Sequence, residues 1–197
     1  MDREIGRGSR LDVVPLSAQR WDDFERLFGP RGACGGCWCM TPRLTRSEYE
    51  RQKGEGNRQA MRALLESGRI PGLLAYLDGQ PVAWCSIEPR HRISSLARSR
   101  ILKPVDERPV WSIVCLFVSK PRRGEGISRR LIGKAVEFAA RQGAECVEAY
   151  PVEPLKKPMP AVFAYTGIAS AFFKAGFREV ARRSPTRPIV RFEIGGE

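Results

Sequence analysis

The alternation of apolar and polar positions predicts several β-strands along the 197-residue chain. The segment "RLDVVPL" (residues 10–16) predicts an opening strand. The segment "GLLAYLDGQPVAWCSI" predicts a hairpin, because Asp78 and Gly79 between its two β-rich runs accept the positive φ angles of a tight turn. Pro81 would place the second hairpin strand at a sheet edge or on a bulge. The nearly continuous apolar run "VWSIVCLFV" from Val110 predicts a strand buried on both faces.

Apolar residues at helical spacing predict helices between these strands. Ser17 is placed to cap the first helix, which should end at Gly29. The sequence "TRSE" from Thr45 has the pattern of a capping box. A longer helix should follow the buried strand and end at Gly143. The apolar faces of three helices are formed by Trp21, Phe24, Leu27 and Phe28, by Ala60, Met61, Leu64 and Leu65, and by Ile127, Leu131, Ala135, Phe138 and Ala139.

The strand from Val110, the helix that ends at Gly143 and the strand "ECVEAYPV" from Glu145 predict a βαβ unit. Its two strands should therefore be parallel, with a right-handed crossover. A short helix through Ala169 follows, and the segments "FREVARR" and "PIVRFEI" predict a closing antiparallel pair. Because the length suits one compact core, we expect a single α/β (α+β) domain over residues 1–197.

Composition and charge narrow the class of protein. Hydrophobic residues make up 42% and charged residues 28% of the chain, as in soluble globular proteins. The net charge of +12 favours an anionic partner: nucleic acid, a membrane surface or a phosphorylated cofactor. No apolar run is long enough to cross a bilayer, and the N-terminal residues lack the apolar core of a signal peptide. We therefore expect a cytoplasmic protein without a membrane partner.

The segment "RRGEGISRRL" from Arg122 lies between the buried strand and its crossover helix. Backbone N–H groups at a helix N-terminus lack partners and favour negative charge, and Gly124 and Gly126 let the backbone approach an anion closely. The Gly-Lys-Ser/Thr triplet of a Walker A loop is missing. A dinucleotide fingerprint needs a small residue where Arg129 stands. The loop therefore predicts an anion site of another type, and a tight turn without a ligand is the structural alternative.

The stretch "LFVSKPRRGEGISRRLI" (residues 116–132) resembles the cofactor motif of the GNAT superfamily of N-acetyltransferases. The family pattern is Arg or Gln, two residues, Gly, one residue, then Gly or Ala, and here Arg123, Gly126 and Ser128 take those places. Ser128 departs from the pattern, but serine is small. The order of elements and the ending "SAFFKAGFREV" are also similar to the family. The resemblance implies a GNAT-like, mostly antiparallel central sheet with a parallel, splayed βαβ pair and flanking helices.

The resemblance also implies the cofactor and the class of acceptor. Acetyl-CoA would be the co-substrate, and a primary amine on a small molecule or peptide would accept the acetyl group by direct transfer. The pantetheine arm would pair with the exposed edge of a strand that separates from its neighbour. The implied cofactor-binding residues are Leu116, Phe117, Val118, Arg123, Gly124, Glu125, Gly126, Ile127, Ser128 and Phe172.

Acetyl transfer to an amine requires a neutral amine, a donor to the carbonyl oxygen and a proton for the leaving thiolate. A backbone N–H near Phe117 meets the second need. The tyrosine that often supplies the proton in this family is replaced by Phe172, so we expect Tyr165 to act instead, with a buried core tyrosine as the alternative. Glu88 and Glu148 are the candidate bases, or else ordinary surface carboxylates.

The segment "CGGCWC" from Cys34 supplies three soft ligands, whereas a closed zinc site needs four, and only His91 or a strand cysteine could complete it. We expect no metal there and assign Cys37, Trp38 and Cys39 to the acceptor pocket. Two other functions remain: a zinc or redox protein built on this loop, and a basic nucleic-acid-binding module. Dispersed charge without an aromatic stacking motif disfavours nucleic acid. The sequence does not determine the oligomeric state, and both a monomer and a homodimer are compatible with it.

Overall fold

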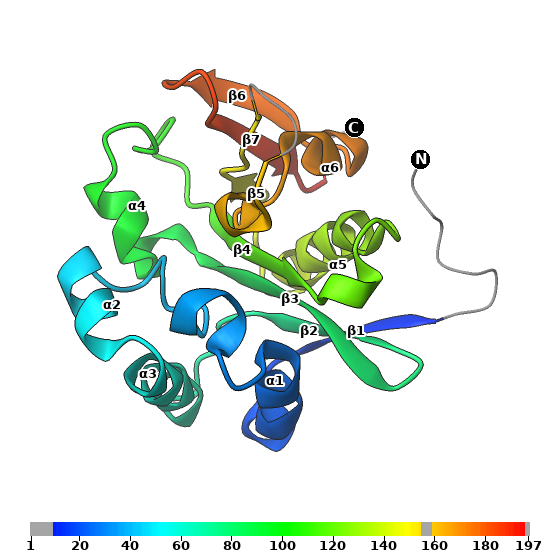
Figure 1. Cartoon of the computed structure of the whole chain (residues 1–197). Helices are drawn as coiled ribbons and strands as arrows, with labels where there is room; N and C mark the ends of the chain where they lie inside the picture. The colour runs from blue at the N-terminus through cyan, green and yellow to red at the C-terminus, as the bar shows by residue number, and fades with distance from the viewer. Residues whose placement is uncertain (1–9, 155–158, 196–197) are drawn as a thin grey trace.

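The computed structural model describes residues 10–154 and 159–195. Its strands form one seven-stranded mixed sheet in the order β1-β2-β3-β4-β5-β7-β6, in which only β4 and β5 are parallel (Figure 1). This confirms the expected fold class. The strands are β1 (Leu11–Pro15), β2 (Leu73–Leu77), β3 (Gln80–Pro89), β4 (Trp111–Val118), β5 (Cys146–Ala149), β6 (Arg178–Arg182) and β7 (Pro188–Glu193).

Helices cover both faces of the sheet. One apolar core lies between the sheet and α5 and α6, and a second lies between the sheet and α1 and α3, with Phe24 and Trp84 completely buried in it. Within the described ranges, no helix has the length and apolar character needed to span a membrane. The helices are α1 (Trp21–Phe28), α2 (Arg46–Gln52), α3 (Glu55–Glu66), α4 (Ser94–Arg98), α5 (Ile127–Arg141) and α6 (Ala169–Lys174).

Two predicted helix caps have different outcomes. Thr45 forms the capping box with Glu48, since each side chain bonds the other residue's backbone N–H. The prediction for Ser17 is wrong, because a 3₁₀ turn at Ala18–Arg20 precedes α1 and the Ser17 hydroxyl accepts a hydrogen bond from Arg20 Nη1 at 3.2 Å. Gly29, with φ of 66°, ends α1 as expected.

The predicted hairpin forms from β2 and β3. Pro81 lies opposite Tyr76, where the register shifts at a β-bulge, so the bulge prediction is confirmed. The edge alternative is wrong, because β3 lies between β2 and β4. The bulge explains how an interior strand tolerates a residue that has no N–H to donate.

Strands β4 and β5 separate after a short parallel pairing. Only Trp111, Ser112 and Ile113 of β4 pair with β5, which confirms the expected splay. Beyond this point a segment before α6 lies in the gap: Leu116 N–H donates to the Tyr165 carbonyl at 2.6 Å, and Val152 N–H donates to the Gly167 carbonyl at 2.8 Å. The chain's own backbone therefore satisfies part of the open edge of β4.

Candidate functional site

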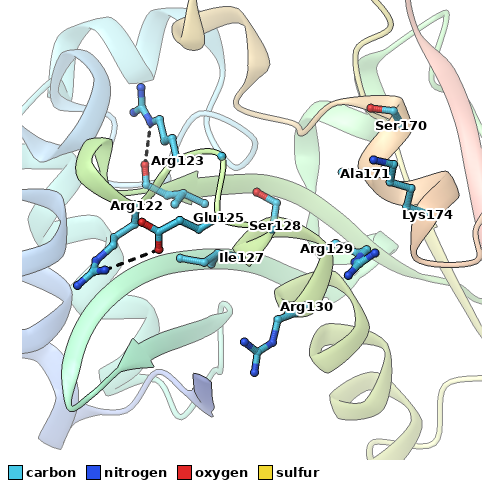
Figure 2. Close-up of a pocket in the computed structure, with 13 residues that line it drawn as sticks. Arg122, Arg123, Glu125, Ile127, Ser128, Arg129, Arg130, Ser170, Ala171 and Lys174 are labelled. Carbon is cyan, nitrogen blue, oxygen red and sulfur yellow. Dashed lines mark hydrogen bonds and ion pairs between the residues drawn. The ribbon is translucent and has the colours of Figure 1, made fainter. Parts of the chain in front are cut away.

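The glycine loop and the start of α5 line a cavity of about 570 Å³ (Figure 2). Gly126 occupies the N-cap position of α5 in the left-handed region with φ of 73°, and Gly124 has φ of 84°. A Cβ atom added at either glycine would meet nothing within 4 Å. Both glycines are therefore required by backbone conformation, and their backbone faces open space.

The backbone N–H groups of residues 124–129 make no hydrogen bond within the described part of the chain, and the first amide of the helix that does is Arg130 N–H, which donates to the Gly126 carbonyl at 3.3 Å. No side chain caps α5, and no acidic residue lies in its first turn. A helix N-terminus with free amides attracts anions. The arrangement therefore has the geometry and charge that suit an anion.

Basic side chains surround this cavity. Arg122, Arg129 and Arg130 line it from the loop and α5, and Lys174 lines it from α6, across the cavity in Figure 2. Glu125 is a carboxylate in the same lining and lies 3.7 Å from Arg122. Sequence analysis missed Lys174 because only the packing of α6 beside α5 brings it to the loop.

The open edge of β4 starts beside this cavity, and Val118 lines both. Arg123 turns back so that its Nε donates to the Val118 carbonyl at 3.0 Å. Phe117 pairs with Trp84 of β3, whereas Leu116 N–H points to the opposite side. Because backbone groups alternate along a strand, Leu116 and Val118 face the open edge and Phe117 does not. The amide near Phe117 that faces the gap is therefore that of Leu116.

Tyr165 lies in the gap between β4 and β5, with its side chain 38% exposed. Burial of the hydroxyl raises the pKa of Tyr165, and the nearby Arg187 charge opposes this only in part. Phe172 is fully buried and packs edge-on against Phe177, so its side chain belongs to the core, and it does not line the cavity. Ile127 is also buried, which leaves its backbone N–H as the group that faces the site.

Glu88 is 1% exposed and is held by two arginines. Arg43 Nη2 donates to one carboxylate oxygen at 2.5 Å and Arg69 Nη2 to the other at 2.6 Å. Arg43 also donates to the Cys39 carbonyl at 3.0 Å. With both oxygens occupied, Glu88 fixes the cysteine loop to β3, and this geometry argues against a role as base.

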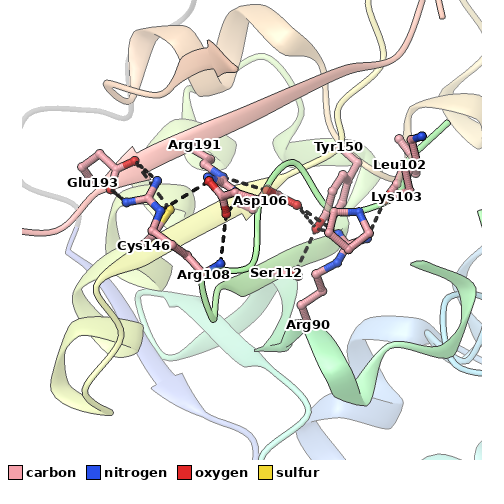
Figure 3. Close-up of polar contacts among 12 residues, drawn as sticks. Arg90, Leu102, Lys103, Asp106, Arg108, Ser112, Cys146, Tyr150, Arg191 and Glu193 are labelled. Atoms are coloured by element: carbon pink, nitrogen blue, oxygen red, sulfur yellow. Dashed lines mark hydrogen bonds and ion pairs between the residues drawn. The ribbon is translucent and has the colours of Figure 1, made fainter. Parts of the chain in front are cut away.

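Glu148 is fully buried in β5, between β4 and β7. It belongs to a larger ionic network, of which Figure 3 shows Arg90, Asp106 and Arg191. Arg90 Nη1 lies 3.0 Å from one of its oxygens and Arg191 Nε 2.8 Å from the other. Arg191 extends the network to Asp106, which it contacts through both terminal nitrogens. The Arg191 guanidinium holds the pKa of Asp106 well below its usual range. Glu148 therefore has no free oxygen to offer a substrate.

The cysteine loop is strained and packed into the core. Trp38 and Cys39 have φ of 40° and 56°, which non-glycine residues rarely adopt, and such strain clusters at functional sites. The Trp38 ring stacks on Phe28, and Cys39 Sγ accepts a hydrogen bond from Trp84 Nε1 at 2.9 Å. Burial raises the pKa of Cys37 to about 11. Among the residues with described positions, no three His, Cys, Asp or Glu side chains gather as metal ligands, so the zinc alternative finds no support.

Comparison with known proteins identifies the family. Residues 38–164 match the model of the "Acetyltransferase (GNAT) family", which spans more than half of the chain and includes the glycine loop. The chain therefore belongs to the GNAT acetyltransferase family. No curated protein matches the chain significantly by sequence.

Solved structures share the fold at low sequence identity. A PaiA N-acetyltransferase from Thermoplasma acidophilum in complex with coenzyme A has a TM-score of 0.52 and 11% identity, over 94% of this chain and 99% of that one. A GNAT-family acetyltransferase from Streptococcus agalactiae has a TM-score of 0.57 and 10% identity, over 95% and 96%. Ard1 from Thermoplasma volcanium has a TM-score of 0.52 and 12% identity, over 93% and 97%. These comparisons establish the GNAT fold.

Proposed function

We propose that the protein is an acetyl-CoA-dependent N-acetyltransferase that transfers an acetyl group directly to a primary amine. The observation that carries this proposal is the row of free amides at residues 124–129, placed in a basic cavity beside the separated end of β4. A similar fold has been solved in complex with coenzyme A. The six free thiols support a reducing, cytoplasmic location. We also propose that residues 1–197 form a single domain.

The cofactor contacts follow from this geometry. The diphosphate binds the N–H groups from Gly124 to Ser128, and the surrounding arginines neutralise its charge. The pantetheine amides pair with the Leu116 carbonyl and with the backbone of Val118, where they replace the Arg123 side chain, and this leaves Leu116 N–H for the acetyl group. The Tyr165 carbonyl and the Arg123 side chain therefore occupy positions along the open edge of β4 that the acyl-pantetheine arm would take, as an added strand does.

The acetyl thioester supplies the activated group, and two groups of the chain act on it. Leu116 N–H, once released from the Tyr165 carbonyl, donates to the acetyl carbonyl oxygen as negative charge develops. The Tyr165 hydroxyl donates its proton to the departing sulfur, and its raised pKa keeps it protonated at neutral pH. We assign no side chain as base, since Glu88 and Glu148 are held by arginines; the amine loses its proton to solvent.

The acceptor enters from the side of the cysteine loop. Cys115 of β4 directly precedes Leu116, whose N–H contacts the Tyr165 carbonyl, and Cys115 and Cys39 belong to one apolar cluster. Trp38 is 5% exposed and packs beneath α1, so its contribution is to hold the loop in shape. Cys39 is 1% exposed and lies against Trp84 of β3, so it acts in the same way, and Cys37 is the most accessible of the three loop residues expected in the pocket.

A calorimetric titration with coenzyme A tests the proposal. We expect saturable binding in the wild type and weaker binding when Gly126 is replaced by valine, which cannot adopt its backbone conformation without strain. Thiol release from acetyl-CoA in the presence of an amine library then measures transfer. Absence of coenzyme A binding in a correctly folded protein would overturn the proposal.

A further inference from the structure

Arg187 lies on the turn between β6 and β7 and differs from its neighbours in its contacts. Its side chain is partly buried, and Nη1 donates to Thr166 Oγ1 at 3.2 Å. A guanidinium carries five N–H donors. Among the described residues, no carboxylate forms an ion pair with Arg187. Its one hydrogen-bond partner there, Thr166, is buried, with 4% of its surface exposed. Most of its hydrogen-bonding capacity is therefore open to a ligand.

Arg182 and Arg183, the arginines nearest to Arg187 on this turn, are committed to the fold. Arg182 pairs with Glu179 and Glu153, and Arg183 donates to the carbonyls of Lys103 and Pro104. Burial without an anionic partner lowers the pKa of Arg187 from its ordinary value. A charge that is partly removed from water without a counter-ion costs stability. Arg187 is therefore poorly explained as a structural residue.

The position of Arg187 connects it to the site of transfer. Its hydrogen-bond partner Thr166 follows Tyr165 directly in the chain. The carbonyl of Tyr165 contacts Leu116 N–H at 2.6 Å. Arg187 lies on the β6–β7 turn and is not among the residues that line the cavity at the glycine loop and the start of α5. The anion that it would bind is therefore separate from the cofactor diphosphate.

We propose that Arg187 binds a carboxylate carried by the acceptor, so that the substrate is an amine that also bears a carboxylate group. This inference rests on the proposed function. Two parallel N–H···O bonds from a guanidinium to a carboxylate give both charge and geometric selection. An amine without an anionic group, such as a polyamine, leaves Arg187 unpaired and binds more weakly.

A product-type ligand tests binding without knowledge of the acceptor. N-acetylglycine carries an acetylated amine and a carboxylate, and N-methylacetamide is its carboxylate-free counterpart. We expect N-acetylglycine to raise the melting temperature of the wild type but not of Arg187→Gln, and N-methylacetamide to leave both unchanged. Equal effects of the two ligands, or an equal shift in the variant, would overturn the inference.

Turnover provides the second readout. In thiol-release assays we expect tyrosine to be preferred over tyramine, and Arg187→Gln to reduce kcat/KM for tyrosine about 10- to 100-fold through KM while tyramine is unaffected. Arg187→Lys should restore part of the loss. Arg183→Gln is the matched control on the same turn and should retain the preference. A parallel pair, O-phosphoethanolamine and ethanolamine, identifies a phosphate preference, which would refute a carboxylate site.

The two proposals fail in different ways. Loss of coenzyme A binding or of thiol release with every amine contradicts the acetyltransferase function. Coenzyme A binding with tyramine and tyrosine used equally contradicts only the role of Arg187. The melting temperature of Arg187→Gln without ligand separates structure from binding, since an unpaired arginine predicts an unchanged or higher value and a structural one a lower value.

Discussion

Arginines have opposite surroundings in two regions of this molecule. Near β5 and β7, Arg90 and Arg191 have side chains 14% and 3% exposed and share the fully buried Glu148. At the glycine loop, Arg129 and Arg130 are exposed and line a cavity in which Glu125 is the one acidic side chain among the described residues. The first region is a closed ionic network, and the second is an excess of positive charge around free amides.

This difference in pairing distinguishes charges that stabilise the fold from charges that are available to bind a ligand. Buried charges are tolerated only when paired, so removal of one member leaves the others unpaired and costly. Exposed charges contribute little to stability but raise the local concentration of an anion. Arg187 is intermediate, since it is partly buried and has no carboxylate partner among the described residues. Variants in the two regions should therefore change different properties.

The largest effect is expected for Glu148→Ala in the closed network. The substitution leaves Arg90 and Arg191 without their shared carboxylate and should lower the free energy of unfolding by about 3–5 kcal/mol, measured by urea denaturation. Glu148→Gln should also destabilise, by a smaller amount. If Glu148→Gln keeps full stability but loses turnover, Glu148 is a catalytic base and the comparison between the two regions is invalid.

Tyr165→Phe should reduce kcat about 10²- to 10³-fold if the hydroxyl is the proton donor to the leaving sulfur, as we propose. An acid must be protonated to act, and burial raises the pKa of Tyr165 above the usual value for a tyrosine. The wild-type rate should therefore be maintained up to about pH 10 and decline only as the pH rises through this raised pKa. Tyr165→Phe should lack that decline, and coenzyme A affinity should be unchanged. An unaffected kcat would remove Tyr165 from the mechanism.

Gly126→Val tests the free amides of the open region. Valine at φ of 73° distorts the N-cap of α5, and we expect coenzyme A to bind about 10- to 100-fold more weakly in calorimetric titrations. Gly133→Ala is the matched control, since this glycine lies within α5 and a Cβ there meets nothing within 4 Å. The control should retain affinity and gain up to about 1 kcal/mol of stability. Equal losses of affinity in both variants would show that α5 stability, and not loop conformation, governs binding.

Glu125→Gln should produce the smallest effect, in the opposite direction. The substitution removes the carboxylate that lies 3.7 Å from Arg122 in the cavity lining. We expect affinity for coenzyme A to rise about 2- to 5-fold at low salt and the gain to shrink at high salt, with stability unchanged because the pair is solvent-accessible. A loss of affinity would indicate that Glu125 orders the loop.

Local features of the fold were predictable because neighbouring residues decide them. Thr45 and Glu48 form their capping box within one helical turn, and Asp78-Gly79 forms the hairpin turn. The uncapped start of α5 was predictable for the same reason, since Gly124 and Gly126 act on the backbone beside them. The error at Ser17 was also local, because a 3₁₀ turn and an α-helix begin with similar residues.

The sequence by itself determined the order of elements, the parallel βαβ unit and the free amides at the start of α5, since each depends on short-range spacing and backbone geometry. Only the tertiary structure decided that Glu88 and Glu148 are buried and paired with arginines, because these partners are as far as 58 residues away along the chain. It also decided that the Tyr165 carbonyl lies on Leu116 and that Arg187 lies near the same tyrosine. Whether a charge is paired depends on packing between segments that are distant in the sequence, and the local spacing of residues does not specify that packing.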